Sequence, residues 1–82
     1  MSEQDVLAGL AEIVNEITGR RASEVVSTAR FVDDLDIDSL SMVEVAVAAE
    51  ERFGVRINDD SLAKLKTVGD AVTFIETARV PA

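Results

Sequence analysis

One serine stands out because of where it lies along the chain. Ser39 belongs to the run DDLDIDSLSM (33–42), in which an acidic loop gives way to an apolar pattern of helical period. The full sequence contains no histidine that could activate the hydroxyl, and no cysteine that could act in its place. We therefore expect Ser39 to be an exposed position at a helix start to which another enzyme attaches a group, and not a nucleophile of this chain.

The negative charge of the chain is concentrated around this serine. Nine acidic residues lie between Asp33 and Asp60 against only two arginines, so this segment holds −7 of the total formal charge of −8. A charge that served solubility alone would be spread more evenly, whereas a concentrated field attracts and orients partners with basic patches. The same field repels phosphates, which argues against nucleic acid as a partner.

Length and composition limit the class of protein. The 82 residues predict a single domain over 1–82 with an ordered core at about 3–78, and 48% hydrophobic residues are too many for a disordered chain. The lack of cysteine excludes a disulfide scaffold. No apolar run approaches the roughly 20 residues that span a bilayer, and the first residues lack the basic start of a signal peptide. We expect a soluble, cytoplasmic monomer that does not bind membranes.

Apolar residues recur at helical spacing in four segments. The pattern predicts helices over residues 3–18, 39–53, 59–64 and 68–78. The expected end signals are N-caps at Ser2, Asp38 and either Asn58 or Asp59, a capping box formed by Thr67 and Asp70, and C-terminal stops at Gly19 and Gly54. No segment alternates like a strand. The sequence therefore predicts an all-α fold, a small antiparallel bundle of three main helices plus one short helix.

A long connection over residues 19–37 joins the first two helices. A loop of this length normally packs or turns locally, so some of its side chains should anchor it to the body. The expected anchors are Val25, Val26, Phe31, Val32, Leu35 and Ile37.

The predicted helix 39–53 carries two apolar faces when projected at about 100° per residue. One is a natural core stripe and holds Met42, Val45, Ala46, Ala49 and Phe53. The other holds Leu40, Val43 and Val47, with Glu44 and Glu51 on one side and Glu50 on the other. An apolar strip with a carboxylate rim fits a partner that offers an apolar groove ringed by basic residues. The alternative, that both faces are buried in a central helix, leaves unpaired carboxylates in costly positions.

These residues together resemble the acyl carrier proteins. The tripeptide Asp38-Ser39-Leu40 is similar to the motif in which the serine of that family bears 4′-phosphopantetheine. The resemblance runs from Val6 to Ile75, and the tripeptide alone would be weak support. The further matching positions are Phe31, Asp33-Asp34-Leu35, Val43-Glu44, Glu50-Glu51, Phe53-Gly54-Val55, Ile57, Asp59-Asp60 and Thr67-Val68-Gly69-Asp70.

Within the family, residues 31–44 are most similar to the discrete carriers of actinobacterial type II fatty acid synthesis, and especially to the meromycolate extension carriers. Two features depart from that pattern. The sequence stops at Ala82 without the long C-terminal tail of the mycolic branch, which favours ordinary fatty acid synthesis over it. Asn58 stands where many members have proline, at the start of the predicted short helix. A polyketide synthase carrier is the alternative within the family.

The resemblance implies a carrier that enzymes modify and use, and not an enzyme. The 4′-phosphopantetheine would be attached to Ser39 between Asp38 and Leu40, and would supply the thiol that this chain lacks. The implied partners are the phosphopantetheinyl transferase and the fatty acid synthesis enzymes: malonyl transferase, ketosynthases, ketoreductase, dehydratase and enoyl reductase. The residues expected to contact such partners are Asp36, Leu40, Val43, Glu44, Val47, Glu50 and Glu51.

Other interpretations of the same residues are weaker. The alternating Asp34, Asp36 and Asp38 suggest a calcium loop, but neither register supplies both the glycine and the final glutamate of an EF-hand. Loose binding of divalent cations stays open. A catalytic serine would need a base, and Lys64 and Lys66 lie in a different helical region. An acidic helical adaptor without a prosthetic group would tolerate loss of the Ser39 hydroxyl, whereas a carrier would not.

Overall fold

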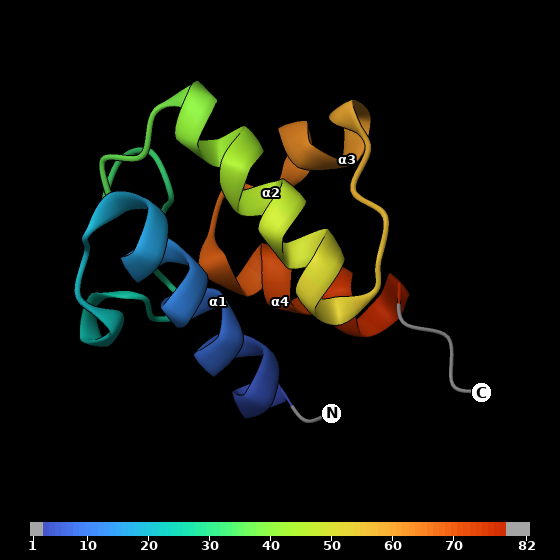
Figure 1. The fold of residues 1–82 in the computed structure, drawn as a ribbon, viewed down its shortest axis with the longest axis horizontal. Coiled ribbons are helices and arrows are strands. Elements are labelled where there is room, and N and C mark those ends of the chain that lie inside the picture. Colours follow the sequence, from blue (N-terminus) through green and yellow to red (C-terminus); the bar gives the residue numbers. More distant parts are fainter. Residues whose placement is uncertain (1–2, 79–82) are drawn as a thin grey trace.

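The computed structural model describes residues 3–78 and shows an all-helical chain (Figure 1). Its elements are α1 (Glu3–Thr18), the short 3-10 helix η1 (Ala22–Glu24), α2 (Ser39–Phe53), α3 (Asp59–Lys64) and α4 (Val68–Ala78). The four α-helices have the bounds that the sequence predicts. Within the described range, β-structure is limited to one isolated bridge between Arg30 and Thr67. The predicted all-α fold class is confirmed.

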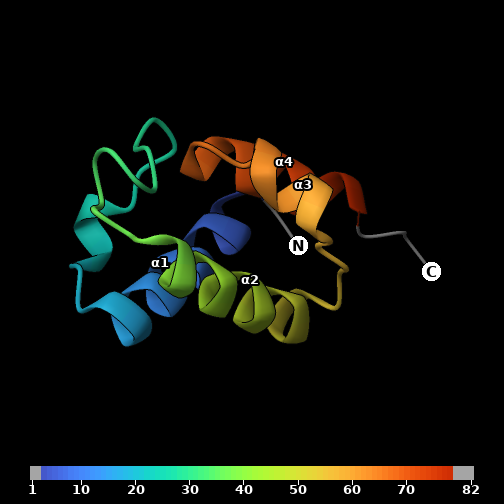
Figure 2. The same cartoon turned by 90° about the horizontal axis from the view of Figure 1, so that it is seen from above.

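Helix α1 lies at the centre of the bundle and packs against both α2 and α4. It runs in the opposite direction to both partners in Figure 1 and in the turned view of Figure 2. The short α3 lies on the connection between α2 and α4. Among the residues described, no helix is long and apolar enough to cross a membrane.

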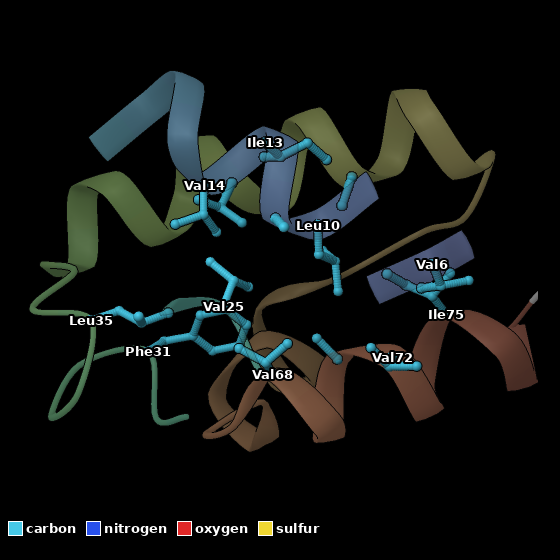
Figure 3. Packing of buried hydrophobic residues seen from close by; sticks show 14 of the residues in the cluster. Val6, Leu10, Ile13, Val14, Val25, Phe31, Leu35, Val68, Val72 and Ile75 are labelled. Atoms are coloured by element: carbon cyan, nitrogen blue, oxygen red, sulfur yellow. The ribbon is translucent and has the colours of Figure 1, made fainter. Parts of the chain in front are cut away.

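The core forms because the apolar stripes of three helices meet. On α1, Val6, Leu10 and Val14 recur every four residues and are almost wholly buried. Figure 3 shows Leu10 pointing toward α4, with Val6 drawn near Ile75 of α4 and Val14 near Val25 of the loop. Burying an aliphatic side chain of this size contributes about 1.5–3 kcal/mol relative to leaving it exposed. The stripes therefore fix how the helices pack.

The helix ends match local signals in the sequence. Gly19 and Gly54 follow α1 and α2 with φ of 78° and 66°, a left-handed conformation that glycine adopts without steric cost. The side-chain oxygen of Asn58 accepts the Ser61 N–H at 2.8 Å and caps α3. The cap is thus Asn58 and not Asp59, so the asparagine that departs from the resembled pattern supplies the N-cap of α3.

The predicted capping box at the start of α4 is present. The Asp70 N–H donates to the Thr67 hydroxyl at 3.0 Å, and the Thr67 N–H donates to the Asp70 carboxylate at 3.1 Å. The backbone hydrogen bond from Thr67 lowers the pKa of Asp70 below its usual value. The N-cap predicted at Ser2 lies outside the described residues.

The loop between α1 and α2 packs by four of its six expected anchors. The buried ones are Val25, Phe31, Leu35 and Ile37. The prediction is wrong for Val26 and Val32, which are exposed. Each of these valines directly follows a buried anchor where the chain turns, Val26 just before the turn at 27–28 and Val32 within the turns at 31–35, so the chain bends away and only the preceding residue reaches the core.

The same loop is tied by its backbone to the α3–α4 link and to the first residues of α4. Gly69 makes the closest approach, because its N–H donates to the Ser27 carbonyl oxygen at 2.8 Å. The other two bonds run from the Phe31 N–H to the Lys66 oxygen at 3.1 Å and from the Val68 N–H to the Ala29 oxygen at 2.9 Å. Three bonds thus hold the loop that leads to Ser39 against the body.

A Gly69→Ala substitution tests this close approach. A Cβ atom at residue 69 would lie 2.8 Å from the Ser27 carbonyl oxygen, a backbone atom that cannot rotate away. An unhindered Gly→Ala change in a helix would stabilise the protein by roughly 1 kcal/mol. We expect Gly69→Ala instead to lower the free energy of unfolding by about 1–3 kcal/mol, as overpacking does. Urea unfolding followed by circular dichroism measures this, with the exposed Thr73→Ala on α4 as control, and a gain in stability would contradict the packing described.

Candidate functional site

Ser39 is the first residue of α2, and its side chain is exposed. The residue before it, Asp38, has an extended backbone with φ of −77° and ψ of 172°, so the chain turns into the helix at this point. The Asp38 carboxylate accepts the Ser41 N–H at 2.8 Å, which confirms Asp38 as the N-cap. The serine is thus held at a defined corner, with its side chain open to solvent.

The capping bond sets the electrostatics of the corner. The backbone hydrogen bond from Ser41, with smaller contributions from the Ser41 hydroxyl and the Leu40 backbone, lowers the pKa of Asp38 below its usual value. The carboxylate therefore stays ionised and occupies an N–H group of the first turn. An anion attached to Ser39 would meet this negative charge as well as the helix dipole, so the helix start offers it no clear net attraction.

An open groove adjoins Ser39 between α2 and the segment around α3. Its wall combines apolar side chains of the loop and both helices, among them Phe31, Ile37, Met42, Val43, Leu62 and Leu65. The cations Arg30 and Lys66 also line it. No hydrogen bond joins Lys66 to Ser39 in the part of the chain described, although both residues line the groove. The groove can receive a flexible group that starts at Ser39.

A second gap lies deeper, beneath α2, and is lined by apolar core residues such as Leu10, Ala46 and Ile75. It holds only about 10 Å³, which is at the lower limit of the room that a single water molecule needs. The core under α2 is therefore closed.

The two faces of α2 are separated as the helical projection predicts. All five residues of the core stripe are buried. On the opposite face Leu40 is 71% exposed, and Val43 and Val47 are each about half exposed. This exposure excludes a central helix with both faces buried. We call Leu40, Val43 and Val47 the α2 strip; Glu44 and Glu51, which the projection places beside it, are also exposed.

Glu50 has a role that the sequence did not reveal. Its carboxylate accepts the Ile57 N–H at 2.8 Å across the loop between α2 and α3, and the residue is half-buried. This bond spans seven residues through an irregular loop, so no helical or strand spacing points to it. Contact of Glu50 with a partner stays a prediction.

The backbone conformation of Asp36 was also not predicted by any pattern in the sequence. In the described range it is the only residue other than glycine with a positive φ, at 54°. Aspartate tolerates this left-handed region better than most residues. Its carboxylate lies 3.9 Å from the guanidinium of Arg20, and both side chains are partly or largely exposed. The pairing depends on how the loop folds, which composition and spacing do not specify.

Across residues 3–78, no cluster of three or more acidic, histidine or cysteine side chains is close enough to hold a metal ion. Of the predicted site residues, Asp36, Asp38, Ser39 and Leu40 lie together in the segment where the chain enters α2. The side chain of Glu50 is directed toward the α2–α3 loop.

Acidification tests the capping carboxylate. An Asp38→Asn variant keeps an acceptor oxygen for the Ser41 N–H but has no charge to titrate. Because the folded-state pKa of Asp38 is lowered, its charge adds stability above the pKa of the unfolded chain, and this contribution is lost as the pH falls through the folded-state pKa. We expect the stability advantage of the wild type over Asp38→Asn to be constant near neutral pH and to shrink on acidification through that pKa.

Urea unfolding across a pH series measures this difference. Asp60→Asn on α3 removes the same charge elsewhere and serves as control. A wild-type advantage that does not change with pH would show that the charge of Asp38 contributes nothing to the cap.

Comparison with known proteins agrees with this geometry. Residues 8–75 match the family model described as a phosphopantetheine attachment site. The acyl carrier protein of Acidothermus cellulolyticus is 60% identical over 82 residues, which cover the whole chain and 98% of that relative. The meromycolate extension acyl carrier protein of Mycolicibacterium aurum is 59% identical over 75 residues, which cover 92% of this chain and 77% of the relative.

A solved structure shares the fold. The acyl carrier protein from Enterococcus faecalis superposes with a TM-score of 0.79 at 33% sequence identity, covering 96% of this chain and all of the other. The family match spans the α2 corner, the loop before it and most of the bundle. The chain therefore belongs to the acyl carrier proteins, whose prosthetic group is 4′-phosphopantetheine.

Proposed function

We propose that Ser39 is the residue that carries the 4′-phosphopantetheine, and that the chain carries acyl groups for fatty acid synthesis. The observation that carries this proposal is that Ser39, the first residue of α2, is exposed and lies beside an open groove. Ser41 lies only two residues further on, but it is half-buried, and its hydroxyl lies beside the Asp38 carboxylate. Ser39 is thus the more accessible of the two serines at this corner.

The residues at the corner fit the group. The hydroxyl of Ser39 is open to a modifying enzyme, and Asp38 fixes the helix start that presents it. The groove offers both apolar and charged side chains to an arm that combines polar and apolar atoms. When bound, the group supplies a thiol for acyl thioesters, and no cysteine of this chain could do so. A tethered carrier of this kind raises the effective concentration of its cargo at each enzyme.

We propose that the chain is a substrate and carrier for enzymes and has no catalytic activity of its own. Its sequence has no histidine, and Lys66 is exposed and makes no described contact with Ser39. Fatty acid synthesis is favoured by the relatives, some of which are named for meromycolate extension. The acyl thioesters recovered from cells would show a different chemistry if the cargo were a polyketide.

Loading with the prosthetic group tests the attachment residue. The wild type, incubated with coenzyme A and a broad-range phosphopantetheinyl transferase, should gain one phosphopantetheine by intact mass spectrometry. Ser39→Ala should gain nothing, because the acceptor oxygen is gone, whereas Ser41→Ala should be modified to completion. Modification of Ser39→Ala, or failure of the wild type under conditions that load another carrier, would show that the assignment is wrong.

The α2 strip is the proposed docking surface for partner enzymes. Leu40, Val43 and Val47 present an apolar centre, and Glu44 and Glu51 lie on the same side of α2. Asp36 adds a further exposed carboxylate, three residues before the helix begins at Ser39. Apolar contact supplies affinity, while the carboxylates select basic partners and speed encounter. We propose that the phosphopantetheinyl transferase, malonyl transferase, ketosynthases, ketoreductase, dehydratase and enoyl reductase meet this face through basic patches.

Charge reversal at Glu44 tests this surface. We expect Glu44→Lys to lower kcat/KM for phosphopantetheine transfer about fivefold at low salt, which corresponds to roughly 1 kcal/mol for an exposed ion pair. The loss should diminish as salt screens the field. Glu16→Lys, an exposed position on α1 with the same charge change, serves as control. Equal losses in both variants would assign the effect to net charge and not to the α2 strip.

We further propose that residues 1–82 act as one domain, as a monomer in the cytoplasm. The high negative charge opposes self-association. The lack of cysteine is compatible with a reducing compartment. Light scattering on the purified protein would reveal a dimer, and fractionation of its host would reveal another location.

A further inference from the structure

The side chain of Arg20 links the end of α1 to the segment that leads into α2. Its Nε–H donates to the carbonyl oxygen of Leu35 at 3.0 Å, fifteen positions further along the chain. The arginine is half-buried, so part of this bond is shielded from water. A charged donor makes a stronger hydrogen bond than a neutral one. The contact therefore joins two parts of the chain that no helix connects.

The backbone of Arg20 is itself fixed to α1. The side-chain amide of Asn15 donates to the Arg20 carbonyl oxygen at 2.8 Å. The Arg20 N–H donates to the hydroxyl of Thr18 at 3.2 Å. The guanidinium thus extends from an anchored base, and the Leu35 carbonyl is held in place relative to α1.

This carbonyl belongs to the peptide group that determines the conformation of Asp36. A peptide unit is planar, so turning the unit between Leu35 and Asp36 changes the ψ of Leu35 and the φ of Asp36 together. Asp36 has a φ of 54°, in the left-handed region that side chains with a Cβ rarely adopt. The Arg20 bond holds the peptide in the orientation that this φ requires. The guanidinium also lies 3.9 Å from the Asp36 carboxylate and 4.0 Å from that of Glu24, but these exposed pairs contribute little beside the bond to Leu35.

The residues on either side of Asp36 restrict what can move. Leu35 and Ile37 are buried in the core, so their side chains anchor both ends of the peptide pair. If the Arg20 bond is lost, the peptide can turn without pulling either anchor from the core. The change would be confined to the Asp36 carboxylate and its backbone, three residues before Ser39.

We infer that Arg20 is a positioning residue for the start of α2 at Ser39: it holds the Leu35–Asp36 peptide and so keeps the Asp36 carboxylate, three residues before Ser39, in one orientation. The inference rests on the proposed attachment at Ser39 and on recognition of Asp36 by the modifying enzyme. Without Arg20, the enzyme would bind only the fraction of molecules whose corner has the right form, and its apparent affinity would fall in proportion.

Three variants test this role. Arg20→Met removes the donor but keeps a long apolar side chain. Arg20→Lys keeps one charged donor without the planar fork, and should restore part of the effect. Arg21→Met is the matched control, because it removes the same charge one residue away. The contact described for Arg21 runs from its backbone N–H to Glu24 and does not need its side chain.

The first measurement is made on the unmodified protein. Backbone NMR, through the HN–Hα coupling and Cα shift of residue 36 and its amide exchange, should report a changed φ in Arg20→Met. Arg21→Met should match the wild type, and so should the core methyl signals of all three variants. Unchanged residue 36 signals in Arg20→Met would overturn the inference, and so would equal changes across the core.

The second measurement is steady-state kinetics with a phosphopantetheinyl transferase. We expect Arg20→Met to raise KM for the carrier about tenfold, in line with the loss of a charge-assisted hydrogen bond, and to leave kcat unchanged. Arg20→Lys should lie between Arg20→Met and the wild type. Equal rises in KM for Arg20→Met and Arg21→Met would overturn the inference. If the wild type itself were not modified, the attachment at Ser39 would fail, while the NMR result would still decide whether Arg20 fixes Asp36.

Discussion

Burial of Phe31 is the constraint on which the attachment corner depends. Its ring is almost wholly buried, and it is one of the largest side chains in the core. Its backbone N–H donates to Lys66, and its carbonyl oxygen accepts the Ile37 N–H at 3.0 Å. One residue thereby ties the long loop to the α3–α4 link and to the segment just before α2. Without this anchor, the loop would lose its largest buried side chain and both backbone bonds of residue 31, and the segment just before Ser39 would be held by fewer contacts.

The division of α2 into two faces follows from opposing demands on a short helix. Its core face must pack against α1, and Gly9 of α1 leaves room for the Phe53 ring, because a Cβ atom at residue 9 would lie 2.6 Å from that ring. Its outer face carries the α2 strip, whose apolar area would be a liability in a neutral protein. The acidic side chains in this part of the chain offset that liability, since like charges keep copies of the molecule apart. Under the proposed function, the same charge would also select the basic partners that cover this surface.

The helices could be predicted from the sequence because their determinants are local. Apolar periodicity and caps such as Asp38 and Asn58 act within a few residues, and they define all four α-helices in the structure. The loop was harder to predict. Hydrophobicity marked Val26 and Val32 as anchors, but it could not tell which of two adjacent apolar residues faces the core.

The candidate site shows the same limit. The position of Ser39 and the exposure of the α2 strip follow from helical geometry, so both could be expected beforehand. The contacts of Glu50 with Ile57 and of Arg20 with Leu35 could not, because they join residues through irregular chain. Such contacts depend on where loops settle once the core has formed, and no periodic pattern encodes them.

The two ends of α2 are both held by carboxylates, Asp38 at its start and Glu50 near its finish. Because both ends are held, the helix keeps its residues at fixed spacings, with a rise of about 1.5 Å for each residue. If enzymes dock on the α2 strip as proposed, one that contacts Val47 would meet the Ser39 oxygen at a fixed distance and angle. Different enzymes that dock on the proposed surface could therefore use the same face of α2. Each would need its active-site opening at the same distance from the residues that contact α2.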